Sequence, residues 1–278
     1  MKQVAYQKLI LLLLQEIYDE RESRNIYKYV LEEYFGQQFI HLDQLILKDE
    51  ELEDFNVIFE KITNHYPIQY IFQKAYFYNF DFFVNEHVLI PRPETEELVQ
   101  LILQENDFSN KSILDIGTGS ACIPITIKKH RNNWAVSAMD ISFYALDVAK
   151  KNAKNHQTEI HFMHQDILNT EAKSFPKYDI IVSNPPYITP KEKNVMSNST
   201  ILYEPDLALF TPEDDALIFY KAIAKFAIEN LNPNGKLYFE LNEFYAEETK
   251  TLLQQYDFKD IRIIKDLSGK NRILSATI

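Results

Sequence analysis

Four consecutive residues near the middle of the chain, Asn184, Pro185, Pro186 and Tyr187, carry groups that could bind a small planar amide or amino group. They follow the apolar run 178–183, which has the composition of a buried parallel strand. Two successive prolines have no N–H to donate, so the strand must end there and leave rigid backbone at its carboxyl end. Open α/β sheets bind ligands at that end. The pattern predicts a site for a planar group with N–H donors, although a simple strand-to-loop turn uses the same residues.

A second cluster follows another apolar strand at 112–116. It consists of Asp115, Gly117, Thr118, Gly119, Ser120 and Ala121. Glycines at such a turn let the backbone approach a ligand closely. A dinucleotide fingerprint would need a third glycine at position 122, which is cysteine. A nucleoside without a pyrophosphate, such as S-adenosylmethionine, therefore fits better, with Asp115 facing its amino-acid end.

Acidic residues end the next two predicted strands. Asp140 lies 21 residues beyond Gly119, where an acid typically accepts hydrogen bonds from both ribose hydroxyls. Asp166 is expected to bind an adenine amino group, and Ile167 could pack on the adenine ring. A helix N-cap is the alternative role for Asp166.

Composition narrows the function classes. The chain has 278 residues, enough for two domains, and its 46% hydrophobic content can form a sizeable core. A net charge of -12 argues against a phosphate backbone as the main partner. Cys122 is the only cysteine, which excludes an internal disulfide and fits a reducing cytoplasm. The leucine-rich run 9–14 is too short to span a bilayer, so no membrane association is expected.

The sequence pattern of the first 74 residues predicts helices. The residues Leu9, Leu12, Leu13, Glu16 and Ile17 indicate a mostly apolar face at helical spacing. A second helix should end at Gly36 as its C-cap, and two more are predicted at 42–47 and 55–62.

The rest of the chain predicts a doubly wound α/β fold. Residues 76–84 and 88–90 suggest a β-hairpin that turns at 85–87, and Thr95 is a reasonable N-cap for the next helix. From residue 112 strands and helices alternate, which predicts a mostly parallel sheet. The runs 261–265 and 273–278 should form an antiparallel finish. The long connection 188–212 suggests a segment that covers the substrate.

With these motifs assembled, the chain resembles the peptide chain release factor N(5)-glutamine methyltransferases of the HemK type. The most specific matches are 90–96, 115–120, 183–188 and 204–209, together with Asp266, Gly269 and Arg272. The resemblance implies an enzyme of the class I S-adenosylmethionine-dependent methyltransferase fold, with a seven-stranded Rossmann-like sheet whose last strand is antiparallel. It implies an N-terminal helical substrate-recognition domain at 1–74, a β-hairpin linker at 75–93 and a methyltransferase domain at 94–278.

The implied reaction transfers methyl from S-adenosyl-L-methionine to the side-chain amide nitrogen of the glutamine in the Gly-Gly-Gln motif of bacterial class I release factors. S-adenosyl-L-homocysteine is the product. Asn184 and Pro185 are expected to accept the two amide N–H groups, Pro186 to line the same site and Tyr187 to pack on the amide plane. The chain is expected to act as a monomer in the cytoplasm, without direct nucleic-acid contact or a metal.

The chain departs from the family's sequence pattern at two positions, and one competing function stays open. The family's loop usually has glycine where this chain has Ala121, which should be tolerated if φ is negative there. Ile167 replaces a frequent aromatic residue and is expected to weaken donor binding.

The competing function is that of a nucleic-acid amino-group methyltransferase acting on adenine N6 or guanine N2, because those amino groups are also planar N–H donors. A nicotinamide-dependent dehydrogenase is disfavoured by the missing third glycine.

Overall fold

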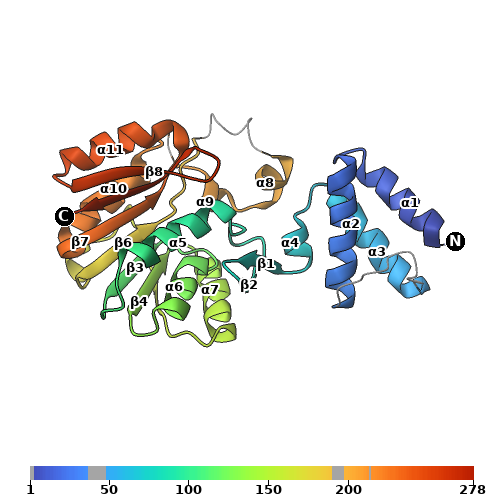
Figure 1. The fold of residues 1–278 in the computed structure, drawn as a ribbon, viewed down its shortest axis with the longest axis horizontal. Helices are drawn as coiled ribbons and strands as arrows, with labels where there is room; N and C mark the ends of the chain where they lie inside the picture. The colour runs from blue at the N-terminus through green and yellow to red at the C-terminus, as the bar shows by residue number, and fades with distance from the viewer. Residues whose placement is uncertain (1–2, 37–47, 190–196, 213) are drawn as a thin grey trace. The chain divides into compact units, whose positions relative to one another are not determined.

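The computed structural model describes residues 3–36, 48–189, 197–212 and 214–278, and the chain divides into two compact units, Met1–Phe72 and Gln73–Ile278 (Figure 1). The first unit is helical. Its helices are α1 (Gln3–Leu14), α2 (Glu20–Phe35), α3 (Asp49–Thr63) and α4 (Ile68–Ile71). Gly36 ends α2 with φ 63°, which confirms the predicted left-handed C-cap. The helix predicted at 42–47 lies outside the described residues.

The predicted apolar face of α1 is wrong. Leu9, Leu12 and Leu13 are 46%, 54% and 40% exposed, whereas Tyr6, Ile10 and Leu14 are buried against α2 and α3. The prediction failed because every residue from 9 to 14 in α1 is apolar, so the spacing of apolar residues does not identify the side of the helix that is buried. The four-residue spacing of the buried side chains is the helical stripe that packs.

The second unit contains the following strands and helices. They are β1 (Lys74–Phe77), β2 (Phe80–Phe83), α5 (Pro93–Glu105), β3 (Ser112–Ile116), α6 (Cys122–His130), β4 (Ala135–Asp140), α7 (Phe143–Asn155), β5 (His161–His164), η2 (Ala172–Ser174), β6 (Tyr178–Ser183), α8 (Asn198–Tyr203), α9 (Asp206–Leu209), α10 (Ile218–Asn230), β7 (Leu231–Glu240), η4 (Glu243–Tyr245), α11 (Ala246–Gln255), β8 (Lys259–Lys265) and β9 (Asn271–Thr277). Across the described ranges, every helix is too short or too polar to cross a bilayer.

Seven of these strands form one sheet in the order β5-β4-β3-β6-β7-β9-β8. The strands from β3 to β7 pair in parallel, and β9 pairs antiparallel with both β7 and β8. The predicted class I methyltransferase topology, with an antiparallel last strand, is confirmed. The chain starts at β3 and adds strands first on one side and then on the other, which makes the boundary between β3 and β6 the place where the strand order reverses.

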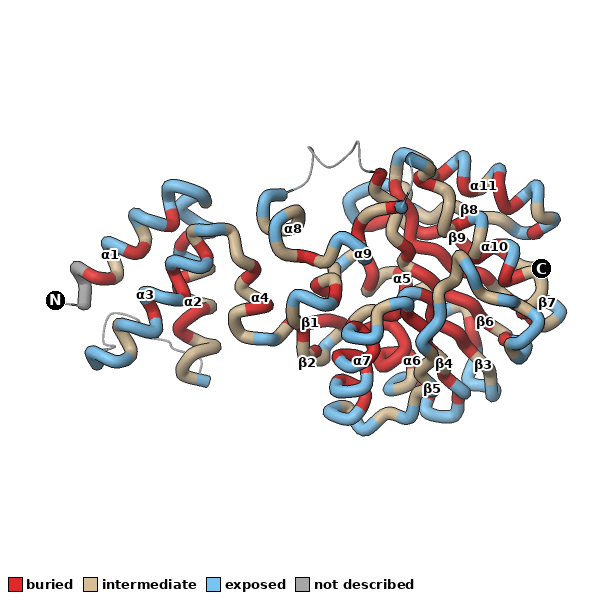
Figure 2. Tube along the Cα trace, turned by 180° about the vertical axis from the view of Figure 1, so that it is seen from behind, coloured by how far each residue is buried: buried red, intermediate tan, exposed pale blue. Residues whose placement is uncertain are grey.

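Helices cover both faces of the sheet (Figure 1). One core cluster joins α5, α6 and α7 to side chains such as Ile113 and Ile180, and the other joins α10 and α11 to side chains such as Leu114 and Ile181. Successive strand residues thus enter opposite cores, as the two-residue period of a strand requires. Figure 2 shows the central strands largely buried and the outward helix surfaces exposed. This burial explains the continuous apolar runs in the sequence.

The predicted hairpin exists but turns at a different place. β1 and β2 pair through Phe77 and Phe80, so the turn is Tyr78-Asn79 rather than 85–87, and 88–90 is not a strand. Both turn residues have positive φ, 47° and 66°, as a tight two-residue hairpin of type I′ requires. The unbroken aromatic run hid the turn, although asparagine is one of the residues that tolerate this conformation.

Candidate active site

Three loops meet where the strand order reverses. The carboxyl ends of β4, β3 and β6 are adjacent, because Ile116 is in register with both Met139 and Ser183. The loop that follows β3 contains the two glycines, the residue that ends β4 is Asp140, and Asn184 directly follows β6. The topology therefore brings the three motifs singled out in the sequence to one edge of the sheet.

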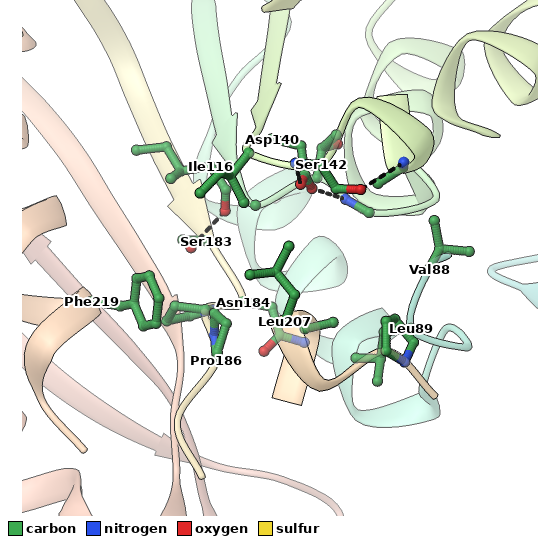
Figure 3. Close-up of a pocket in the computed structure, with 18 of the residues that line it drawn as sticks. Val88, Leu89, Ile116, Asp140, Ser142, Ser183, Asn184, Pro186, Leu207 and Phe219 are labelled. Carbon is green, nitrogen blue, oxygen red and sulfur yellow. Dashed lines mark hydrogen bonds between the residues drawn. The ribbon is translucent and has the colours of Figure 1, made fainter. Parts of the chain in front are cut away.

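A cavity of about 630 Å³ lies at this edge. In Figure 3 Asp140 and Ser142 lie along one side of it, Asn184 and Pro186 along another, and Val88 and Leu89 along a third. Its volume is within the range of small-molecule sites. Its walls contain the predicted residues Gly117, Thr118, Gly119, Ser120, Asp140, Asp166, Ile167, Asn184, Pro185 and Pro186.

The glycine loop is held by hydrogen bonds to the end of β4. The N–H groups of Gly117 and Thr118 donate to the Met139 carbonyl at 2.9 and 3.0 Å, and Gly119 N–H donates to Asp140 Oδ2 at 2.8 Å. Gly117 and Gly119 have φ of 75° and 52°. A Cβ at either position would have no atom within 4 Å, so both glycines border open space. A ligand could therefore approach the loop backbone closely.

The condition placed on Ala121 is not met, because this residue has φ 62° and not a negative value. The left-handed conformation costs a non-glycine residue about 1–2 kcal/mol. The Ala121 methyl group is fully buried in the core beside α6, which offsets about 0.8 kcal/mol of that cost. The loop thus keeps the backbone shape that glycine would adopt, at a small energetic disadvantage.

Asp140 is fixed with its two oxygens engaged by backbone. Oδ2 accepts from Gly119 N–H and Oδ1 from Ser142 N–H, the latter at 2.9 Å. Burial raises the pKa of Asp140, and these N–H groups act in the opposite direction. Each carboxylate oxygen has a further lone pair, so Asp140 can also accept from ligand hydroxyls at the cavity wall.

Asp115 lies beneath the loop and not in the cavity wall. Its carboxylate is buried, and neither oxygen has a hydrogen-bond partner among the described residues. Burial raises the pKa of Asp115 to about 7, with a further increase from nearby Asp140, while Thr118 lowers it. The predicted contact of Asp115 with a donor amino-acid end stays a prediction.

The raised pKa predicts a pH-dependent stability. A carboxyl whose folded-state pKa lies above its unfolded value stabilises the fold when protonated, and that contribution is lost as the pH rises through about 7. The free energy of unfolding of the wild type should therefore fall by about 1.4 kcal/mol between roughly pH 6 and pH 8, and this decrease should be absent in Asp115→Asn. Urea unfolding of both proteins at the two pH values measures it.

Asp179→Asn is the matched control. Although partial burial opposes the effect, hydrogen bonds from Ser112 and Asn232 lower the pKa of Asp179, so its substitution should not flatten the pH profile. Equal pH slopes for the wild type and Asp115→Asn would contradict the prediction.

Asp166 and Ile167 both line the cavity. Asp166 Oδ1 accepts from Leu168 N–H at 2.9 Å, and Oδ2 accepts from Asn169 Nδ2 at 2.6 Å. The carboxylate thus closes a turn after β5, and no helix begins there, so the N-cap alternative is wrong. The proposed adenine contacts of both residues stay predictions.

The four-residue cluster is only partly gathered at the cavity. Asn184, Pro185 and Pro186 line it, whereas Tyr187 is not among its lining residues and packs, partly buried, against the core cluster that includes α10 and α11. The Tyr187 carbonyl accepts from Asn242 Nδ2 at 3.3 Å. The described geometry therefore supports the amide-binding role for Asn184 and Pro185, and the contact predicted for the Tyr187 ring stays a prediction.

Thr95 lies at the site although it was not predicted to belong to it. Thr95 is not an N-cap, because α5 begins at Pro93 with Arg92 as N-cap. Thr95 instead lines the cavity. Proline at the first helical position was the signal that could have corrected this prediction. The connection 188–212 contributes wall residues from 205 to 212. Its role in covering a substrate stays a prediction.

Glu204 fixes that connection to the segment before α5. Its buried carboxylate accepts from Ile90 N–H at 3.0 Å and forms an ion pair with Arg92. Arg92 is thus an ion-paired residue that also lines the cavity.

The parallel sheet, the antiparallel β9 and the glycine loop beside Asp140 define a class I methyltransferase fold. The methyltransferase small domain model matches residues 94–212. A release factor glutamine methyltransferase from Flavobacterium psychrophilum is 41% identical over 94% of this chain and 94% of its own length. One from Bacteroides thetaiotaomicron is 42% identical over 95% of each chain. The chain belongs to the release factor glutamine methyltransferase family.

Solved structures agree at the level of the fold. A methyltransferase from Pyrococcus furiosus superposes with a TM-score of 0.52 at 16% identity, covering 81% of this chain and 98% of that one. The hMettl16 catalytic domain gives a TM-score of 0.54 at 18% identity over 70% of this chain and 74% of that one. At these identities the likeness shows the fold alone.

Proposed function

We propose that this protein transfers the methyl group of S-adenosyl-L-methionine to the side-chain amide nitrogen of the glutamine in the Gly-Gly-Gln motif of peptide chain release factors. The observation that carries the proposal is the placement of Asn184 and Pro185 at the cavity, beside the glycine loop and Asp140. Relatives at 41% and 42% identity are release factor glutamine methyltransferases, which supports the same reaction.

The residues at the cavity fit this donor. Gly117 and Gly119 leave open space beside the loop, and Asp140 offers a carboxylate for ribose hydroxyls. The buried Thr118 hydroxyl lines the cavity and has no partner among the described residues, so a polar group of a ligand could satisfy it. We assign the amino-acid end of the donor to the Asp115 side of the loop and its adenine to Asp166 and Ile167.

The chain's own contribution to the reaction is to hold the acceptor amide. S-adenosyl-L-methionine supplies an electrophilic methyl group on a sulfonium and leaves as S-adenosyl-L-homocysteine. An amide nitrogen is a weak nucleophile because its lone pair is delocalised, so positioning must supply most of the rate enhancement. Asn184 Oδ1 and the Pro185 carbonyl each accept one N–H of the glutamine amide. They orient the nitrogen and favour the positive charge that develops on it as the N–C bond forms and the methyl–sulfur bond breaks. The methylated nitrogen then loses one proton to solvent water.

We further propose that the helical unit, with its boundary near residue 74, holds the release factor, and that residues 75–93 link it to the methyltransferase domain at 94–278. The protein is proposed to act as a monomer in the cytoplasm, without direct contact to nucleic acid. The net charge of -12 supports a protein acceptor over a polyanionic one.

Transfer of labelled methyl tests the proposal. The protein is incubated with labelled S-adenosyl-L-methionine and either a purified bacterial class I release factor or total tRNA and rRNA. Label is expected on the release factor alone, and a release factor with the motif glutamine changed to alanine should take up none. Label on nucleic acid only would overturn the assignment in favour of an amino-group methyltransferase.

A further inference from the structure

Two buried side chains lie directly behind Asn184. Thr95 Oγ1 is 2.6 Å from Glu240 Oε2, and Asn184 Nδ2 is 3.4 Å from Thr95 Oγ1. Thr95 and Glu240 are 3% and 2% exposed. A chain of hydrogen bonds therefore runs from the end of β7 through the first turn of α5 to the residue that follows β6.

The direction of these hydrogen bonds follows from the chemistry of the three groups. An ionised carboxylate only accepts, so Thr95 must use its single hydroxyl hydrogen to donate to Glu240. Thr95 can then only accept from Asn184, and the group that faces it must be the Nδ2 amide nitrogen. Asn184 Oδ1 has no partner among the described residues, so it is left free at the cavity.

We infer that Thr95 and Glu240 are positioning residues that fix the orientation of the Asn184 amide, so that its oxygen and not its nitrogen meets the substrate N–H group. This inference rests on the proposed function. A turned amide would present two donors to a substrate amide that itself donates, and the hydrogen bond that holds the nucleophile would be lost.

The charge state of Glu240 decides whether the chain of hydrogen bonds has this direction. The ionisable groups around its carboxylate are Glu94 and Arg92 at the start of α5, Cys122 at the start of α6, Arg272 on β9, Tyr187, and Tyr220 on α10. The Tyr220 hydroxyl donates to the Glu240 carbonyl at 3.0 Å. Burial raises the pKa of Glu240 to about 7. The Thr95 hydrogen bond and the two arginines act to lower this pKa, whereas Glu94 raises it further. A protonated carboxyl could donate to Thr95 and reverse both hydrogen bonds.

Single substitutions test the positioning role. Thr95→Val keeps the side-chain volume but removes the hydroxyl, and kcat for release factor methylation should fall about 10–100-fold, while Kd for S-adenosyl-L-homocysteine changes less than about threefold. Thr95→Ser keeps the hydroxyl and should retain kcat within about threefold. Glu240→Gln can donate from its amide nitrogen to Thr95, and we expect a loss of kcat similar to that of Thr95→Val.

A pH profile separates positioning from simple support of the fold. At saturating donor, wild-type kcat should fall as the pH drops below about 7, and Glu240→Gln should lack this acid limb. Thermal melting of each variant identifies any that fails to fold. If Thr95→Val or Glu240→Gln does not fold, the positioning role is tested by the kcat of Thr95→Ser and by the acid limb of the wild-type pH profile.

The two levels of the proposal fail in different ways. Full kcat in folded Thr95→Val, or an acid limb that persists in Glu240→Gln, would overturn the positioning role and leave the proposed function intact. A wild-type protein that does not methylate the release factor would instead overturn the function itself.

Discussion

Replacing Asn184 with alanine is expected to lower kcat for release factor methylation by about 10²–10³-fold, the usual effect of removing one group that stabilises developing charge. The variant loses the Oδ1 acceptor at the cavity but keeps the glycine loop and Asp140. Its Kd for S-adenosyl-L-homocysteine, measured by calorimetry, should therefore stay within a fewfold of the wild-type value.

Asn232→Ala is the matched control, because Asn232 also donates a side-chain hydrogen bond, to Asp179 Oδ1 at 2.8 Å, but at the opposite end of the sheet. Its kcat should remain close to that of the wild type. Wild-type turnover by folded Asn184→Ala would refute the assignment of the amide acceptor.

Asp140→Asn should weaken donor binding by about 100-fold or more. The substitution removes a charge-assisted acceptor for the ribose hydroxyls, each such hydrogen bond contributing about 1.5–3 kcal/mol. It also places an amide nitrogen against either Gly119 N–H or Ser142 N–H, which both donate to the native carboxylate. Calorimetric titration with S-adenosyl-L-homocysteine gives the change in Kd.

Asp179→Asn again provides the comparison, since Asp179 accepts from a backbone N–H, that of Ser112 at 2.7 Å, and lies far from the carboxyl ends of the strands. This variant should bind the ligand as the wild type does. If Asp140→Asn bound the ligand with unchanged affinity, the ribose assignment would be wrong.

The sequence predicted best those features that depend on neighbouring residues. Pro185 and Pro186 end β6 for a covalent reason, the lack of N–H donors, and the apolar runs before Gly117, Asp140 and Asn184 mark strands buried on both faces. Once these strands are placed in parallel, their carboxyl ends converge without any knowledge of side-chain contacts. The fold and the centre of the site followed from those facts.

Features that depend on tertiary packing could not be predicted in the same way. Thr95 and Glu240 are 145 positions apart, and nothing local distinguishes the threonine that binds a buried glutamate from one that caps a helix. The buried side of α1 depends on which helices pack against it. Tyr187 belongs to the predicted four-residue cluster, yet it is not among the residues that line the cavity and packs, partly buried, against the core cluster that includes α10.

The position of β9 has a consequence for how the chain folds during synthesis. β7 and β8 do not pair with each other, since β9 lies between them, and β9 is made after both. Until it emerges, β8 has no partner in the sheet and β7 keeps an open edge, which is the kind of surface that invites wrong pairing. Glu240 ends that edge in register with Ile273, so the strand end that supports Asn184 stays open on one side until β9 is added. Folding intermediates of this protein should therefore lack activity even when most of the sheet has formed.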